Sequence, residues 1–184
     1  DTGLALHVTD RLLVSSGVTC EFHSLSLDDA EFGVRNDEFV RDFIMRINES
    51  QSTLIRHLVH ARVEISSTRG TDTLAKIIAE PVVKLVSIMD HSPGQGQYVS
   101  DELFRFYVAK TTGRNDREID EIIAHKKLQR QFIPDRIDTV VDLCHQYHIP
   151  IATHDDDTVT KITEWNRLNI RISEFPTTMI AAHA

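Results

Sequence analysis

Short apolar runs of strand length alternate along the chain with longer stretches of helical periodicity. The strand-like runs lie at residues 18–22, 58–65, 82–89, 149–153 and 169–173. Hydrophobic residues recur at helical spacing between them, in segments at 8–15, 36–50, 71–80, 101–131, 134–144 and 158–168. A strand followed by a helix, repeated about five times, predicts βα units around a parallel sheet.

Local signals sharpen several of these boundaries. Residues 82–89 are almost continuously apolar, which is typical of a parallel strand covered on both faces. Asn36 is a predicted N-cap, and so is Thr71 or Asp72 for the next helix. That helix is expected to end before Pro81, because the residue preceding a proline is pushed out of α geometry.

The charged stretch 101–131 reads as one helical region. Lys126, Lys127 and Arg130 are predicted to close it as cations near a helix C-terminus. In the following helix, His145 and His148 are three residues apart and are expected to lie on a solvated face.

Two architectures generate this alternation, an open doubly wound sheet and a (β/α)8 barrel. The chain has 184 residues, whereas a whole barrel needs about 250. It starts at Asp1 inside an amphipathic pattern and stops just after an apolar helical start at 178–182. We therefore expect residues 1–184 to form a single α/β unit, the central part of a longer protein.

Composition narrows the classes of partner. The formal charge of −8 argues against a nucleic-acid footprint, which normally requires a basic face. No apolar run approaches the roughly 20 residues that cross a bilayer, so no membrane partner is expected. Cys20 and Cys144 form no metal or disulfide pattern, and buried reduced thiols in a cytoplasmic protein are expected.

Polar residues with catalytic potential follow four of the five predicted strands. They are Glu64, Asp90 with His91, His154 with Asp155 and Asp156, and Glu174. Because the carboxyl ends of parallel strands share one rim, these side chains are expected to converge there. Two imidazoles and one or two carboxylates would make a site for a divalent ion, zinc first, with iron or manganese as alternatives.

The aspartates after His154 are interpreted in two ways. Like charges in a row repel unless a cation lies among them, so Asp155 or Asp156 is a candidate base toward a metal-bound water, and the other would orient a ligating imidazole. The alternative is a helix N-terminus that the acids cap, which suits Asp157 best. Glu174 is assigned a supporting role beside the site or a structural one before Pro176.

Several stretches carry a resemblance to a known family. They are VSIMDHSPGQGQY at 86–98, THDDDT at 153–158 and EFPTT at 174–178, with LVSSGVT at 13–19 and HARVE at 60–64 in the expected order. In these stretches the chain resembles the PhnM-type amidohydrolases of phosphonate metabolism, and the similarity spans essentially its whole length.

The resemblance implies part of a metal-dependent (β/α)8 barrel of the amidohydrolase superfamily. It also implies hydrolysis of α-D-ribose 1-methylphosphonate 5-triphosphate to diphosphate and the 5-phosphate, on the carbon–phosphorus lyase route. Glu64, His91 and His154 carry over as metal ligands. The first-strand H-x-[HD] motif and the last-strand aspartate of the family have no counterpart in this sequence, so an incomplete site with a tendency to self-associate through open sheet edges is expected.

Three other readings stay open on the residues alone. An amidohydrolase that acts on a cyclic amide or a nucleobase amine would use the same site. A response-regulator-type domain would bind a divalent ion through clustered aspartates, but it needs acids near the first strand and a late lysine, which the sequence lacks. A catalytically inert α/β fragment of the same hydrolase would keep the fold alone.

Overall fold

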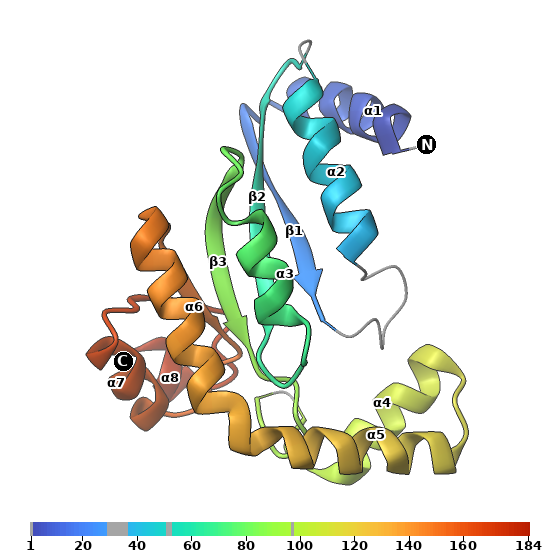
Figure 1. Ribbon diagram of the computed structural model, residues 1–184, viewed down its shortest axis with the longest axis vertical. Helices are drawn as coiled ribbons and strands as arrows, with labels where there is room; N and C mark the ends of the chain where they lie inside the picture. The colour runs from blue at the N-terminus through green and yellow to red at the C-terminus, as the bar shows by residue number, and fades with distance from the viewer. Residues whose placement is uncertain (1, 29–36, 51–52, 97) are drawn as a thin grey trace.

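Five parallel strands form one sheet in the computed structural model, which describes residues 2–28, 37–50, 53–96 and 98–184 (Figure 1). The strands are β1 (Cys20–Leu27), β2 (Arg56–Glu64), β3 (Val83–Met89), β4 (Ile151–His154) and β5 (Ile172–Glu174). The helices are α1 (Thr2–Ser15), α2 (Asp37–Glu49), α3 (Gly70–Ile77), α4 (Asp101–Thr112), α5 (Asp116–Gln129), the 3-10 turn η1 (Arg130–Phe132), α6 (Ile133–Tyr147), α7 (Val159–Arg167) and α8 (Met179–Ala182). The predicted parallel α/β sheet is therefore confirmed.

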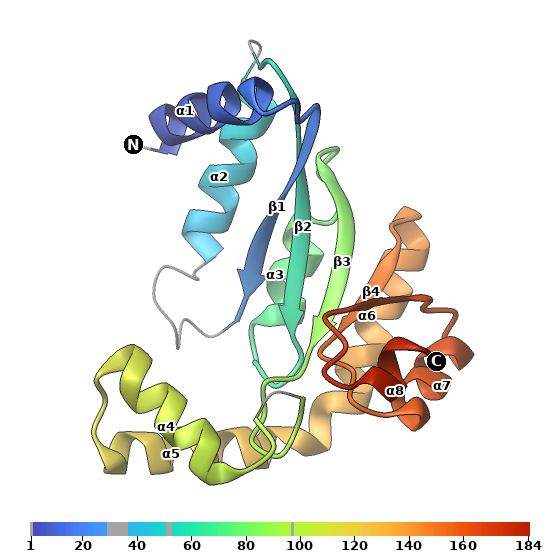
Figure 2. The same ribbon diagram turned by 180° about the vertical axis from the view of Figure 1, so that it is seen from behind.

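The strands follow one another across the sheet in chain order, β1-β2-β3-β4-β5, and every neighbouring pair is parallel. A doubly wound sheet reverses its strand order at a switch point, and this sheet does not. Helices α2, α3 and α6 lie on one face, in front of the strands in Figure 1 and behind them in Figure 2. The order and the one-sided helices describe a repeat of βα units.

The two faces of the sheet differ in chemistry because successive side chains of a strand point to opposite sides. The helix-covered face is a buried apolar layer that includes Leu25, Leu27, Val59, Ala61, Val63, Val86 and Ile88. The register places polar residues on the opposite face, among them Ser24, His60, Arg62, Ser87, His154 and Glu174. Two of the candidate residues at strand ends, His154 and Glu174, therefore lie on the polar face.

The charged stretch predicted as one helix is a hairpin of two. Helix α4 ends at Gly113, whose φ of 69° is left-handed, and Asn115 with Glu118 forms a complete capping box at the start of α5. The hairpin lies beyond the carboxyl ends of the strands and has its own core of Tyr98, Phe104, Val108, Ile119 and Ile123 (Figure 1). Both the glycine and the capping box were present in the sequence, so this break was predictable.

Other boundaries shift by a few residues. The first strand extends to Leu27, well beyond the predicted end at residue 22, and the last comprises only Ile172–Glu174. Residues 169 and 170 instead belong to the turn that follows α7, in which Asn169 is left-handed at φ 59° and the Ile170 amide bonds back to the Trp165 carbonyl. The predicted cap at Asn36 lies outside the described residues.

Predictions about single residues hold in part. Arg69, not Thr71 or Asp72, occupies the N-cap of α3. His145 and His148 are both exposed as predicted, although His148 is the left-handed C-cap of α6 at φ 55° and lies just outside the helix. Cys144 is buried as predicted, and burial raises the pKa of its thiol to about 12, whereas Cys20 is only half-buried.

Three histidine and aspartate side chains join α1 to the start of the sheet. Asp10 on α1 accepts hydrogen bonds from the Leu54 and Ile55 amides and from His57 Nε2 at 3.0 Å, and His57 Nδ1 meets His23 Nε2 at 2.8 Å. This row lies at the amino end of the sheet, beside α1, and Figure 2 shows that end opposite to the carboxyl ends of the strands. Among the described helices, none has both the length and the apolar character needed to cross a membrane.

Candidate metal centre

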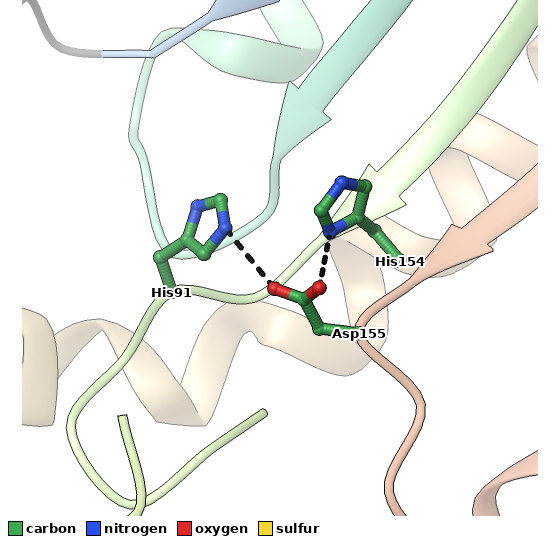
Figure 3. Close-up of side chains that lie close together, drawn as sticks. All are labelled: His91, His154 and Asp155. Carbon is green, nitrogen blue, oxygen red and sulfur yellow. Dashed lines mark ion pairs between the residues drawn. The ribbon is translucent and has the colours of Figure 1, made fainter. Parts of the chain in front are cut away.

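His91, His154 and Asp155 come together at the carboxyl end of the sheet (Figure 3). His91 follows β3, His154 is the last residue of β4, and Asp155 begins the loop after it. One ligand atom from each lies within 4.8 Å of the other two. Among the described residues this is the set of histidine, cysteine and acidic side chains that could hold an ion.

The carboxylate of Asp155 lies between the two imidazoles. Asp155 Oδ1 is 3.1 Å from His154 Nδ1, and Asp155 Oδ2 is 3.7 Å from His91 Nε2. Asp155 Oδ2 and His154 Nδ1 are buried and have no hydrogen-bond partner. Buried polar atoms normally have hydrogen-bond partners. Two buried atoms without such a partner, side by side, are what a site for a cation would provide.

Glu64 lies behind His91 and does not belong to this three-residue set. Its Oε2 accepts a hydrogen bond from His91 Nδ1 at 2.8 Å, and the His91 backbone amide donates to Oε1 at 3.1 Å. A carboxylate on one imidazole nitrogen fixes the tautomer that leaves the other nitrogen for a metal. Glu64 therefore lies where a residue that orients the His91 ring would lie, the position that the sequence analysis expected for an aspartate, and Asp155 is the carboxylate that lies with the two imidazoles.

Asp156 points into the protein instead of toward the site. Its oxygens accept hydrogen bonds from Thr153, from Ser173 and from the indole of Trp165, and its side chain is buried. These bonds tie β4, β5 and α7 together and do not favour Asp156 as a base. Asp157 precedes α7 and pairs with Lys161 at 3.0 Å, and the N-cap that the sequence analysis expected at Asp157 is occupied by Thr158.

Glu174 stands one step along the rim, paired with His154 in the register of β4 and β5. Its Oε2 lies 3.5 Å from His60 Nε2 and is buried without a hydrogen-bond partner. Glu174 is therefore on the polar face beside the site and outside the three-residue set.

The backbone at Asp155 is held in an uncommon conformation. Its φ is 57°, a left-handed value that costs a non-glycine residue energy and often marks a functional position. Its amide donates to the Glu174 carbonyl at 2.9 Å. On the other side lies Gly96, where an added Cβ would approach Asp155 Cβ to 3.1 Å. The glycine that follows Gln95 thus gives Asp155 the room it needs.

Charges in the site are strongly coupled. Burial opposes the charged form of His91, but the nearby carboxylate of Asp155 and the hydrogen bond to Glu64 outweigh it and raise the pKa of His91 to about 9. Burial likewise opposes ionisation of Glu64, yet the hydrogen bond from His91 and the charge of Lys126 lower the pKa of Glu64 to about 2. Burial also opposes ionisation of Asp155, but the imidazoles of His154 and His91 outweigh it and lower the pKa of Asp155. The position between the carboxylates of Glu64 and Asp155, where the His91 imidazolium lies, thus favours a positive charge.

Arg62 is a functional candidate that the sequence reading missed. It points from β2 along the polar face, and its Nη2 donates to His154 Nε2 at 2.7 Å. A metal on Nδ1 of His154 would shift the ring proton to Nε2, so Arg62 would have to turn away from it. Strand alternation with Glu64 would have placed Arg62 on the same face.

His60 lies outside the three-residue candidate set and provides a test of the polar face that needs no bound metal. Its imidazole contacts Ser87 Oγ at 2.9 Å and Ser24 Oγ at 3.3 Å, and burial, with the charges of Arg62 and His154, lowers its pKa from 6.5 to about 4. Between these pH values the unfolded chain binds a proton that the folded chain does not. Lowering the pH from 6.5 to 4 should therefore cost up to about 3 kcal/mol of stability through this group, with no contribution above 6.5.

The measurement is urea unfolding of wild type and His60→Gln at several pH values. The glutamine variant should lose less stability on acidification than wild type. Two parallel pH profiles would contradict the assignment.

Comparison with known proteins gives one curated relative. Over 184 aligned residues the chain is 30% identical to alpha-D-ribose 1-methylphosphonate 5-triphosphate diphosphatase of Escherichia coli (strain K12). The chain is a partial homologue of that enzyme. The alignment covers 98% of this chain and 49% of the relative, so the chain spans about half the length of the curated relative that it matches. No protein-family profile matches the chain, and no solved structure matches it.

Proposed function

We propose that the chain carries the metal centre of a phosphonate-metabolism hydrolase, which cleaves diphosphate from α-D-ribose 1-methylphosphonate 5-triphosphate. The observation that carries this proposal is the convergence of His91, His154 and Asp155 at one end of the sheet. The curated relative, matched over 98% of this chain and 49% of its own length, supports a related hydrolase function. The ion is zinc by preference, because two imidazoles and a carboxylate suit it, and iron or manganese would also accept this set.

The five βα units are proposed to form part of a (β/α)8 barrel of the amidohydrolase superfamily. The strand order without reversal supports this, as does the placement of α2, α3 and α6 on one face. In such a barrel the polar face would line the interior, and the ligands would lie at the carboxyl ends of the strands, where barrel enzymes carry their active sites.

The residues divide the work as follows. A divalent ion held by His91, His154 and Asp155 would supply a water whose pKa falls toward about 7. Glu64 keeps the His91 ring in one tautomer through the 2.8 Å hydrogen bond to Nδ1. Arg62, on the polar face beside His154, offers a guanidinium that pairs with the anionic oxygens of a phosphate.

The test is a product assay with metal-loaded protein and α-D-ribose 1-methylphosphonate 5-triphosphate. Diphosphate should appear with Zn²⁺ or Mn²⁺ and disappear in Asp155→Ala, and the E. coli relative serves as the positive control. Ammonia from a nucleobase, or ring opening of a cyclic amide, would point to the alternative amidohydrolase reaction. No product from any of these substrates, under conditions where the relative is active, would overturn the proposal.

A further inference from the structure

Helix α5 buries a lysine among its apolar residues. Lys126 is 2% exposed and continues the stripe of Ile119 and Ile123, the other buried residues of that helix. Lys126 and Lys127 both lie in the last turn of α5, as the sequence predicted, but the Lys126 side chain is buried, whereas Lys127 is exposed and pairs with Asp101. Removing an ammonium from water is costly unless it is paired and hydrogen-bonded, so its contacts identify its role.

The ammonium connects to the candidate metal centre through two residues. Lys126 Nζ donates to Ser66 Oγ at 2.9 Å, and the Ser66 hydroxyl in turn donates to Glu64 Oε1. The other oxygen of Glu64 accepts the bond from His91 Nδ1. Because a lysine can only donate, the serine proton must point to Glu64, and each bond in this row has a fixed direction.

The row also balances charge in a buried place. Glu64 is 3% exposed, and a lone carboxylate there would be strongly unfavourable. Lys126 lies outside the set of candidate ligands and supplies a positive charge near Glu64. This charge remains when His91 gives up its proton to bind a metal. The hairpin of α4 and α5 thereby contributes to the site although none of the three candidate ligands lies on it.

We propose that Lys126 is a positioning residue of the metal centre, which acts through Ser66 to hold Glu64 against His91 Nδ1 so that His91 Nε2 faces the ion. This rests on the proposed function, because it requires a metal at His91, His154 and Asp155. It goes beyond that function by assigning a role to a helix of the projecting hairpin.

The experiment compares Lys126→Met with Lys127→Met, which removes the same charge one residue away at the exposed surface. Zn²⁺ dissociation constants are measured by competition with a chromophoric chelator, and the Co²⁺ absorption spectrum reports the geometry of the ligands. Loss of an outer-shell partner typically weakens metal affinity 10- to 100-fold. We expect a loss of that size and an altered Co²⁺ spectrum for Lys126→Met, with wild-type values for Lys127→Met.

A double-mutant cycle separates positioning from simple structural support. Ser66→Ala should weaken binding similarly, and the double variant should lose much less than the product of the two single losses, because both act on one row. If Lys126→Met does not fold, Ser66→Ala still tests the link, since it removes the bridging hydroxyl and retains the ammonium.

The outcomes distinguish the two claims. A wild-type protein that binds neither Zn²⁺ nor Co²⁺ overturns the proposed function and the role of Lys126 with it. A wild-type protein that binds both ions, with a folded Lys126→Met or Ser66→Ala that binds them equally well, overturns only the role of Lys126.

Discussion

Replacing His91 with alanine is expected to weaken Zn²⁺ binding by at least about 100-fold, because it removes a donor and not merely a partner of one. The imidazole stands between Glu64 and Asp155, so its loss also leaves two carboxylates without the cation that they share. The same variant should lose diphosphate release. Equilibrium dialysis and the product assay measure the two effects.

His145→Ala is the matched control for this change. His145 is an exposed histidine on α6, outside the three-residue candidate set, so its loss should alter neither metal affinity nor turnover. Wild-type affinity in His91→Ala would show that the three-residue set is not a metal centre, whatever reaction the protein performs.

Replacing Gly70 with alanine is expected to destabilise the fold by about 3 kcal/mol, at the upper end for an overpacked position. A Cβ at this residue would lie 2.8 Å from the carbonyl oxygens of both Glu64 and Leu27. Both are backbone atoms at the ends of neighbouring strands, so neither can turn aside as a flexible side chain would. The better helix propensity of alanine, about 1 kcal/mol, offsets only part of this cost.

Thermal unfolding should show this as a fall in Tm of about 6–12 °C for a chain of this size. Gly17→Ala is the control, since nothing lies within 4 Å of that position and only its φ of 82° is unfavourable. A left-handed alanine costs about 1–2 kcal/mol, so Gly17→Ala should lower Tm by less. Equal stabilities of Gly70→Ala and wild type would mean that the backbone at the end of β2 can move to accommodate the added methyl group.

The periodicity of the chain was sufficient to predict the parallel sheet, because each strand is a distinct apolar run between polar segments. It was not sufficient for the ends of elements. β1 continues through Ser24 and Ser26, which lie on the polar face and interrupt the apolar pattern. A search for continuous apolar runs misses such a strand, since every second residue is polar.

The candidate site was predictable in its location and less so in its division of roles. Histidines after two strands had to meet at the shared rim, and His91 and His154 do. Which carboxylate lies beside the two imidazoles depends on backbone direction, however. The left-handed turn at Asp155 aims that side chain between the rings, while Asp156 turns inward to three hydrogen-bond donors. Neither the turn nor the partners can be read from three consecutive aspartates.

Two backbone hydrogen bonds join the loop at Asp155 and Asp156 to the end of β5 and the residues just after it. The Asp155 amide bonds to the Glu174 carbonyl at 2.9 Å, and the Thr177 amide bonds to the Asp156 carbonyl at 2.8 Å. An ion that binds only while the loops are joined suppresses their opening by the factor 1 + [L]/Kd. Hydrogen–deuterium exchange at these two amides therefore gives a direct reading of site occupancy, with no substrate present and no reaction to follow.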